Sequence, residues 1–501
     1  MRGNQLDERF EKLVQETLDR WHVPGVSVAV VDGDNTWAKG YGVASFPSTP
    51  VTPSTLFYAG STTKAFTSAI MATLVEDNDN FPQVQWDTPV SQLIRDDFVL
   101  ENEYATNHTT IEDTLSHRTG LPRHDTAYGD RLGPDVAVRT IVRQLRHLPL
   151  TAEPRTKYQY CNLMFVVASH VIQTLTGEWL GDILARRIWK PLGMTATFFN
   201  RDHALAAKED LARGYYYSPD EGYKEVDWMP LHEIAGAGSV ITNVLDYAKW
   251  ARALLNQTEP LSKAVYKAIW EPRTLVPQEV PFTGPQSYAL GWRIGVYQGV
   301  QFYEHSGGMN AFGAELILIP ELKYSVIILA NTAATSNFVA QTLAFHLIDE
   351  RLDVPVEKRF DWNQHNLNGL KKEKAKVDNA LQRCYPTLPS PVLPNTVPLH
   401  KYTGTYWHPG YQKLTVYLDK TTGVLRADRS DTTWPEYMSF EHVSSDYFLI
   451  KAEHQGDYGA FFPEVYPAEF RVGVDGKPYA LGVGWEKEMD GKIWLERVDS
   501  H

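Results

Sequence analysis

The chain has 501 residues, which is enough for two or more domains and a large core. Its 48 Lys and Arg against 61 Asp and Glu give a net charge of −13 without a basic cluster, which argues against binding to nucleic acid or an anionic membrane surface. Hydrophobic residues make up 43% and charged residues 22%, and these ordinary globular values exclude a disordered protein.

The hydrophobic periodicity predicts helices and strands in a mixed order. In chain order, we expect a helix over 6–21, strands over 26–32 and 36–44, helices over 61–77 and 163–177, strands over 289–304, 313–319 and 324–330, and a helix over 334–350. Gly177 is expected to end the helix before it, and Phe66, Ile70 and Leu74 would face the core from theirs. Strands at both ends, with mostly helices and loops over 78–235, indicate an α+β domain.

The composition changes after about residue 353. Residues 366–384 are charged and predict a helix, and residues 386–398 hold five prolines in thirteen positions, which is typical of a stiff linker. Six short alternating segments, separated by turn residues, then fill residues 401–501. We therefore expect a main domain over 1–355, a helical and proline-rich linker over 356–398, and a small antiparallel β-barrel over 399–501.

Cofactor and compartment signals are few. Cys161 and Cys384 are too few for a disulfide framework, and neither they nor the 16 histidines have metal-site spacing. No phosphate loop or dinucleotide fingerprint is present, so we expect no metal and no cofactor. The N-terminal residues lack the apolar run of a signal peptide, and no stretch approaches the ~20 apolar residues that span a bilayer. These features predict a cytoplasmic protein that binds neither membrane nor nucleic acid.

Ser61 and Lys64 are the first candidate catalytic residues. They lie three positions apart at the predicted start of a helix, so the amine can reach the hydroxyl. Serine needs a neighbouring base, and lysine is a base near neutral pH only where burial or positive charge lowers its pKa. A buried helix N-terminus supplies both effects and offers free N–H groups to an oxyanion. Taken alone, however, the tetrapeptide favours a solvated first turn of a helix.

Two further motifs lie far along the chain. Tyr160 offers a phenol that can share a proton with Lys64, and Asn162 offers an amide for Lys64 and a substrate carbonyl. Residues 305–308, His-Ser-Gly-Gly, lie between strand-like segments, where glycines let a substrate backbone approach a strand edge. Taken separately, Tyr160 and Asn162 are better explained as a core tyrosine and a helix-capping asparagine, and residues 305–308 are equally well explained as a hairpin turn.

In this order, the three motifs resemble the serine β-lactamase and DD-peptidase superfamily, whose signature contains Ser-x-x-Lys, a Ser-Asp-Asn type element and Lys-Thr-Gly. The Tyr-x-Asn and His-x-Gly variants resemble the branch of class C β-lactamases, peptidase S12 enzymes, family VIII esterases and transesterases. Further stretches resemble that branch in the same order, at residues 22–30, 115–122, 191–194 and 235–242. The resemblance covers roughly 10–350, and residues 399–501 resemble the lipocalin-like barrel of some members.

The resemblance implies a β-lactamase/transpeptidase-like α+β fold, with an antiparallel sheet flanked by helices and a helical subdomain. It implies a serine hydrolase that acts on an ester or amide bond of a small molecule or short peptide. His305 stands where penicillin-recognising relatives keep a lysine. Because histidine is mostly neutral at pH 7, it offers less charge to a substrate carboxylate, and β-lactamase activity would be a side activity only.

The resemblance also assigns a role to each motif residue. Ser61 would form the acyl-enzyme, Lys64 and Tyr160 would act as general base, and either of the two could hold the proton at rest. Asn162 would orient Lys64 and the substrate amide. The backbone N–H groups of Ser61 and Gly308 would form the oxyanion hole.

Substrate contacts are expected from Gly307 and from two loops. Residues 212–228 form an aromatic-rich loop in which Tyr216 and Trp228 would line a site for an apolar or aromatic acyl group, and packing between subdomains is the equal alternative. Arg123 lies in a loop that runs near the cleft in relatives. It would replace the missing lysine as the partner of a carboxylate.

Other functions stay open. An acyltransferase or transesterase would move the acyl group to a small-molecule acceptor in a biosynthetic pathway, and pocket shape decides between water and that acceptor. A non-catalytic scaffold is the alternative of another class, although every expected catalytic side chain is present. The barrel would be a lid, a pocket wall or an oligomer contact, so a homo-oligomer is compatible with the sequence, and ligand binding in the barrel is the alternative.

Overall fold

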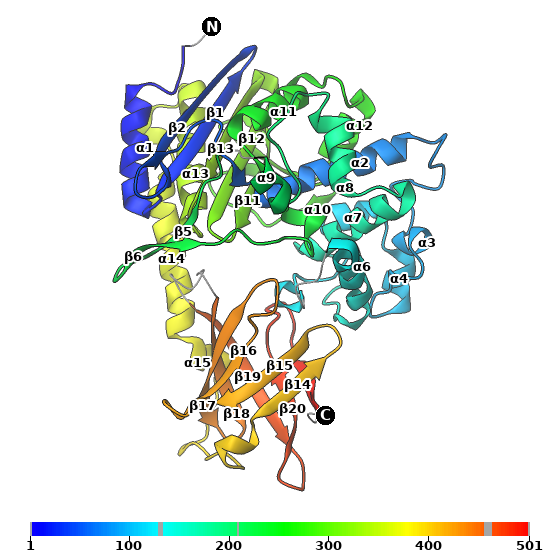
Figure 1. Ribbon diagram of the computed structural model, residues 1–501, viewed down its shortest axis with the longest axis vertical. Helices are drawn as coiled ribbons and strands as arrows, with labels where there is room; N and C mark the ends of the chain where they lie inside the picture. The colour runs from blue at the N-terminus through cyan, green and yellow to red at the C-terminus, as the bar shows by residue number, and fades with distance from the viewer. Residues whose placement is uncertain (1–2, 129–133, 208–209, 455–462, 499–501) are drawn as a thin grey trace.

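The computed structural model describes residues 3–128, 134–207, 210–454 and 463–498. Figure 1 shows a main domain with a sheet at its centre, a separate β-barrel below it, and a long helix that runs from one to the other. The expected α+β fold with a following antiparallel barrel is confirmed. Among the described residues, the structure contains no helix long and apolar enough to cross a membrane.

A nine-stranded antiparallel sheet organises the main domain, in the order β3-β2-β1-β13-β12-β11-β10-β9-β8. The strands are β1 (Gly25–Asp32), β2 (Asn35–Ser45), β3 (Thr49–Pro50), β8 (Thr274–Leu275), β9 (Thr283–Tyr288), β10 (Arg293–Tyr297), β11 (Val300–Met309), β12 (Phe312–Ile319) and β13 (Tyr324–Ala330). The first and last strands of the domain, β1 and β13, pair at its centre. The sheet therefore joins the two ends of the domain, as the pattern of the sequence predicts.

Both faces of the sheet are buried at its central strands β1, β12 and β13. In β13, Ile327 and Leu329 belong to one core, while Val326 and Ile328 belong to the other. Helices α1 (Glu8–Trp21) and α13 (Thr335–Arg351) cover the second core, and α2 (Thr63–Glu76) and α11 (Val244–Asn256) lie in the first. Because alternate side chains of a strand point to opposite faces, a doubly covered strand reads as a continuous apolar run.

Helix α2 lies inside the domain rather than on its surface. Phe66, Ile70 and Leu74 are buried as expected, but so are the residues on the other sides of the helix, including Lys64 and Met71. A short 3₁₀ turn, Gly60–Thr62, leads into it. The other helices of the helical subdomain surround it (Figure 1): α3 (Val90–Leu93), α4 (Glu103–His108), α5 (Ile111–Leu115), α6 (Pro134–Gln144), α7 (Asn162–Thr176), α8 (Leu180–Leu184), α9 (Arg201–Ala206), α10 (Ala235–Gly238) and α12 (Lys263–Trp270).

Three local expectations require correction. The strand expected over 289–304 is two strands, β10 and β11, joined by a turn at Gln298 and Gly299. Residues 305–308 are part of β11 and not a turn. The aromatic loop at 212–228 contains a β-hairpin of β5 (Gly214–Ser218) and β6 (Gly222–Val226), in which Tyr217 lies opposite Tyr223.

The C-terminal barrel is closed by eight antiparallel strands. They are β14 (Gly404–His408), β15 (Gln412–Leu418), β16 (Leu425–Asp428), β17 (Glu436–Ser444), β18 (Tyr447–His454), β19 (Glu464–Val472), β20 (Pro478–Val483) and β21 (Ile493–Val498). Six of them match the expected segments, whereas β14 and β17 were not expected. Aromatic rings pack against one another inside, with the Tyr402 and Phe470 centroids 4.8 Å apart and those of Phe448 and Phe470 5.5 Å apart.

The linker is anchored at both ends. Trp362, the first residue of α14 (Trp362–Asp378), stacks on Phe345 of α13 with ring centroids 4.5 Å apart. Past α15 (Ala380–Cys384), the Tyr385 hydroxyl donates to the Phe448 carbonyl of the barrel at 2.8 Å. The proline-rich residues after it have no helix or strand until residue 399. These contacts hold the barrel against the main domain.

Candidate active site

The structure brings Ser61, Lys64 and Tyr160 together. Ser61 lies in the 3₁₀ turn before α2, and Lys64 lies in the first turn of that helix. Lys64 Nζ is 3.0 Å from Ser61 Oγ, and the Tyr160 hydroxyl donates to the same oxygen at 2.9 Å. Tyr160 comes from the segment before α7, 99 positions along the chain. One serine oxygen thus has an amine and a phenol within hydrogen-bonding distance.

Lys64 is fully buried, with 0% of its surface exposed. Burial lowers its pKa well below the ordinary 10.5, and the positive charge of Arg123 lowers it further, while Asp125 acts in the opposite direction. Besides Ser61, the amine contacts Asn162 Oδ1 and the Ala237 carbonyl, each at 2.8 Å. A neutral amine can donate to these two acceptors and keep its lone pair for the serine proton.

The Tyr160 phenol keeps its proton, in contrast to the Lys64 amine. Burial raises the pKa of its phenol above the ordinary value, and its hydrogen bond to Ser61 only partly offsets that effect. The ring packs between His117, at a centroid distance of 4.3 Å, and the Arg123 guanidinium, at 4.9 Å. His117 Nδ1 accepts from the Cys161 N–H at 3.0 Å. The neutral phenol is therefore a hydrogen-bond donor fixed by its neighbours.

Asn162 does not act as a helix cap. Its Oδ1 accepts from Lys64, and its Nδ2 donates to Asp125 Oδ1 at 3.2 Å. Asp125 Oδ2 accepts from Arg123 Nε at 2.6 Å. The amide of Asn162 is thus oriented from both sides, and Asp125 is a member of the site to which the sequence assigned no role.

Strand β11 passes close to the serine turn. Its pairing with β10 ends at Glu304, so residues 305–309 leave one edge free toward Ser61. A Cβ atom on Gly307 would lie 2.1 Å from the Ala59 carbonyl, and one on Gly60 would lie 2.9 Å from the Gly308 nitrogen. Gly307 is therefore needed for the approach of two backbone segments rather than for room around a substrate, whereas Gly308 lines the cavity together with Ser61.

His305 is buried and neutral. Burial and the nearby Lys64 lower its pKa to about 3. Its Nδ1 lies 2.6 Å from the Ser306 carbonyl, and its Nε2 lies 2.9 Å from the Tyr288 hydroxyl. Because a carbonyl only accepts, Nδ1 carries the proton and Nε2 accepts from Tyr288. The ring offers no positive charge to a ligand.

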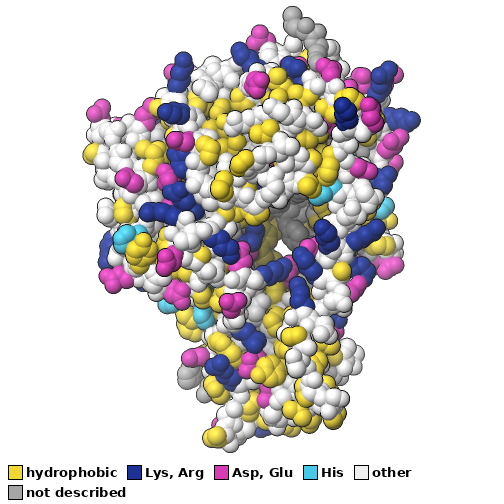
Figure 2. Space-filling view, turned by 180° about the vertical axis from the view of Figure 1, so that it is seen from behind, with side chains coloured by type: hydrophobic (Ala, Val, Ile, Leu, Met, Phe, Trp, Pro, Cys, Tyr) yellow, Lys and Arg dark blue, Asp and Glu magenta, His cyan; other side chains and the backbone are white. Residues whose placement is uncertain are grey.

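A cavity of about 620 Å³ opens around Ser61, and both domains line it. Main-domain residues in its wall include Ser61, Arg123, Tyr160, Asn162, His305 and Gly308. The barrel contributes Trp434, Glu464, Tyr466, Trp485, Glu486 and Lys487. Figure 2 shows the surface hollowed where the two domains meet, with Lys and Arg side chains near the rim. The expected role of the barrel as a pocket wall agrees with this arrangement.

Comparison with known proteins identifies the family. The family model described as "Beta-lactamase" matches residues 10–348. The chain belongs to the β-lactamase family. Residues 388–497 match a second model, described as a domain of unknown function (DUF3471).

Two similar relatives of this β-lactamase family chain are fungal. The unguisins hydrolase ungD' of Aspergillus campestris (strain IBT 28561) is 51% identical over 504 residues, covering 100% of this chain and 93% of the relative. The unguisins hydrolase ungD of Aspergillus violaceofuscus (strain CBS 115571) is 45% identical, covering 98% of this chain and 91% of the relative. The chain is thus an enzyme of the β-lactamase-like hydrolase family.

Solved structures share the fold at lower identity. The octameric penicillin-binding protein homologue from Pyrococcus abyssi superimposes with a TM-score of 0.61 at 21% identity, covering 97% of this chain and 99% of that one. The D-amino acid amidase from Ochrobactrum anthropi SV3 gives 0.57 at 23% identity and covers 69% of this chain and 98% of that one. The first of these therefore matches both domains of this β-lactamase family chain.

Two aromatic residues expected in the pocket do not line this cavity. Trp228 is 7% exposed, and its ring packs against Tyr58 and Phe312 at centroid distances of 4.5 and 4.6 Å. Its indole N–H donates to the Ala212 carbonyl at 2.9 Å. Tyr216 packs on the same core from the β5–β6 hairpin. Trp228 thus packs in the first core and does not line this cavity.

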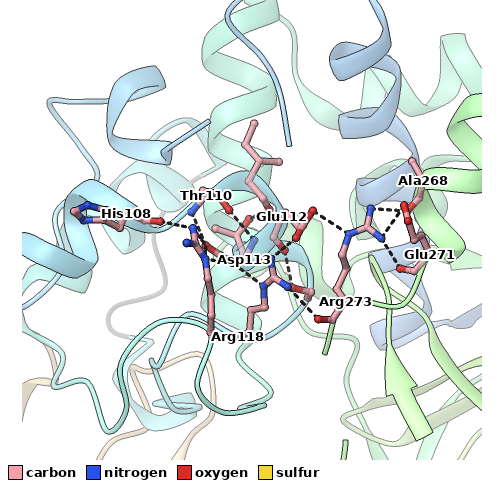
Figure 3. Close-up of polar contacts among 12 residues, drawn as sticks. His108, Thr110, Glu112, Asp113, Arg118, Ala268, Glu271 and Arg273 are labelled. Carbon is pink, nitrogen blue, oxygen red and sulfur yellow. Dashed lines mark hydrogen bonds and ion pairs between the residues drawn. The ribbon is translucent and has the colours of Figure 1, made fainter. Parts of the chain in front are cut away.

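Arg118, from the same loop as Arg123, serves a different network (Figure 3). It donates to Asp113 Oδ1 at 2.6 Å and to the Arg273 carbonyl at 3.0 Å, and it pairs with Glu112. Arg155 binds Asp113 from another side, at 2.9 Å. This cluster ties α5 to the segment after α12, and it has no direct contact with Ser61.

Proposed function

We propose that the protein is a serine hydrolase that cleaves an ester or amide bond through an acyl-enzyme on Ser61. The observation that carries the proposal is the position of Ser61 Oγ, 3.0 Å from a buried lysine amine and 2.9 Å from a protonated phenol. A hydroxyl with a base and a proton donor at this range, at the wall of a cavity, is the arrangement that nucleophilic acyl transfer requires.

The lowered pKa of Lys64 supports Lys64 as the resting base. Ser61 Oγ attacks the carbonyl carbon, and its proton moves to Lys64 Nζ. The tetrahedral oxyanion accepts hydrogen bonds from the backbone N–H groups of Ser61 and Gly308. Tyr160 gives its proton to the leaving nitrogen or oxygen and regains one from Lys64. Water then attacks the acyl-enzyme by the reverse sequence.

The charges of the cavity favour a substrate without a free carboxylate at the site. Each Lys or Arg among the described lining residues has an ion-pair partner: Arg123 with Asp125, Arg293 with Glu279, and Lys487 with Glu464. His305, the remaining basic side chain among them, is neutral. Cleavage of an internal amide or ester is thus favoured over removal of a C-terminal residue.

Unguisins are the first substrates to test, because relatives that are 51% and 45% identical are named unguisins hydrolases. The protein and Ser61→Ala are incubated with an unguisin and with a panel of activated esters, amides and β-lactams, and intact-protein mass and product mass are recorded. We expect an acyl adduct and product from the wild type alone. Adducts on both proteins, or on neither, would overturn the proposal.

The same reactions separate hydrolysis from acyl transfer. A primary alcohol or amine added at increasing concentration competes with water for the acyl-enzyme. A hydrolase yields mainly the free acid, whereas a transferase yields the new ester or amide.

A second variant tests whether Arg123 binds a substrate carboxylate. The rates of the wild type and of Arg123→Ala are compared on a substrate with a free acid and on the corresponding amide. An unchanged preference between the two substrates would exclude that role.

A further inference from the structure

The loop of residues 123–128 lies between the catalytic residues and the barrel. On one side, Asp125 accepts from Asn162 Nδ2 at 3.2 Å and from Arg123 Nε at 2.6 Å. On the other side, the neighbouring backbone groups of the loop are bound by barrel side chains. The loop therefore connects the barrel to the Asn162 amide, which contacts the proposed base Lys64.

Three barrel residues bind this loop directly. Glu486 Oε2 accepts from the His124 backbone N–H at 2.8 Å. Arg429 Nη2 donates to the Thr126 carbonyl at 2.9 Å. The Tyr411 hydroxyl lies 2.6 Å from His124 Nδ1. These contacts flank Asp125 on both sides in the sequence.

The tautomer of His124 decides which group donates in its hydrogen bond with Tyr411. Its Nε2 lies 2.8 Å from the Pro149 carbonyl, so Nε2 carries the proton and Nδ1 accepts from Tyr411. Burial lowers the pKa of His124 to about 4, which keeps the ring neutral in this role. The residue also has a positive φ of 46°, a strained backbone conformation that its surroundings must hold.

Arg429 is a buried charge of the barrel. Only 1% of its side chain is exposed, and it is 3.5 Å from the fully buried Glu436. Tyr466 donates to the second Glu436 oxygen at 3.1 Å. Burying such a pair costs free energy that apolar packing would avoid. The guanidinium uses Nη2 to join two carbonyls, Thr126 of the main domain and Tyr411 of the barrel at 3.0 Å.

We propose that Tyr411, Arg429 and Glu486 are positioning residues of the active site. They hold residues 124–126 so that the Asp125 carboxylate receives the Asn162 N–H₂ group. An amide turned by 180° would point N–H₂ at Lys64, whose amine needs the carbonyl oxygen as an acceptor. The barrel thereby fixes the orientation of the lysine base as well as lining the cavity. This inference rests on the proposed acyl-enzyme mechanism.

The test measures the rate at which a fluorophosphonate labels Ser61, because this reagent does not depend on the natural substrate. We expect Glu486→Ala to label about tenfold more slowly than the wild type and Glu486→Gln, which keeps an acceptor oxygen, within about threefold of it. Glu469→Ala is the matched control, since it breaks an ion pair with Lys492 at 3.0 Å elsewhere in the barrel and should leave labelling unchanged. Circular dichroism and elution volume verify that each variant is folded.

A double-mutant cycle distinguishes positioning from a general loss of structure. If Glu486 acts through Asp125, then adding Glu486→Ala to Asp125→Ala slows labelling by less than about twofold, whereas independent effects would multiply to about tenfold again. Multiplying effects, or a Glu486→Ala rate equal to that of the wild type, would overturn the inference. If Glu486→Ala does not fold, Tyr411→Phe replaces it in the cycle with the same criterion. Equal labelling of wild type and Ser61→Ala would instead overturn the proposed mechanism.

Discussion

Removal of the Tyr160 hydroxyl is the most direct test of the proposed proton relay. Tyr160→Phe deletes the donor that lies 2.9 Å from Ser61 Oγ. The ring contacts remain, with His117 at 4.3 Å and the Arg123 guanidinium at 4.9 Å. One lost hydrogen bond costs about 0.5–1.5 kcal/mol of stability, whereas loss of a general acid or base slows the reaction by about 10²–10⁴. The variant should therefore fold and acylate slowly.

The pH dependence then separates the phenol from the amine. Because the buried Lys64 has a pKa well below 10.5, acylation should rise with pH as Lys64 loses its proton, with a midpoint below that value. Tyr160→Phe should keep this rise at a lower rate, and Lys64→Met should abolish it.

The assay is intact-protein mass against time with an activated ester, from pH 5 to pH 9, with urea unfolding of each variant as the control for folding. Two results would refute the reasoning. A Tyr160→Phe rate within threefold of the wild type would remove the phenol from the relay. Loss of the pH-dependent rise in Tyr160→Phe, with retention in Lys64→Met, would make the phenol the base.

Three further predictions concern stability. Trp228→Ala should cost about 3–5 kcal/mol in urea unfolding and leave the KM for aromatic esters unchanged, since an increase in KM without destabilisation would restore the pocket role. Asp113→Ala should cost about 3–5 kcal/mol, because it removes the buried carboxylate that Arg118 and Arg155 share, and an unaltered midpoint would contradict the network in Figure 3. His124 has a folded pKa of about 4 against 6.5 when unfolded, so the unfolded chain binds a proton first as pH falls. Urea unfolding at pH 7 and pH 5 should show a loss of about 2 kcal/mol from this residue, absent in His124→Asn.

The fold could be read from the sequence where the pattern is local. The helix at α7 and its end at Gly177, which has a φ of 68°, follow from periodicity and from a residue that adopts this conformation without strain. The strand pair β1 and β2 follows from two apolar runs around a turn. Strand β17 alternates buried and more exposed residues only as far as Phe440; the alternation then breaks at Glu441 and His442, where the pairing with β18 also shifts register, so the periodic signal covers only half of the strand.

Some residues of the candidate site could also be predicted from local sequence, and others could not. Ser61 and Lys64 are neighbours on one turn, so their meeting could be predicted from spacing. Tyr160 and Asn162 could be placed only through the resemblance to a family. Asp125 and the Ala237 carbonyl had no signal, because a carboxylate and a backbone oxygen gain their roles from tertiary contact alone. The cavity wall from the barrel likewise depends on how the linker folds.

Aromatic content was a poor guide to the pocket for a physical reason. A large ring gains free energy by leaving water, whether it covers a ligand or a neighbouring ring. Trp228 satisfies its N–H on the Ala212 carbonyl and fills the core, whereas Trp485, from the barrel, stacks on Tyr411 at 4.9 Å and lines the cavity. Whether such a ring fills the core or lines the cavity is decided by where the tertiary structure places its part of the chain.

The signal that separates a catalytic Ser-x-x-Lys from a solvated one lies in the residues that follow it. Between Thr63 and Val75, Lys64 is the only charged side chain, and every residue of α2 from Thr63 to Ala72 is buried. On an amphipathic surface helix, the same lysine would stay in water, with a pKa near 10.4 and a proton that it cannot release at neutral pH. The apolar continuation places the amine in the core, and burial lowers its pKa, as the proposed role of a base requires. A charge at Ala65 or Ser68, both fully buried, would therefore destabilise the fold by the same desolvation penalty.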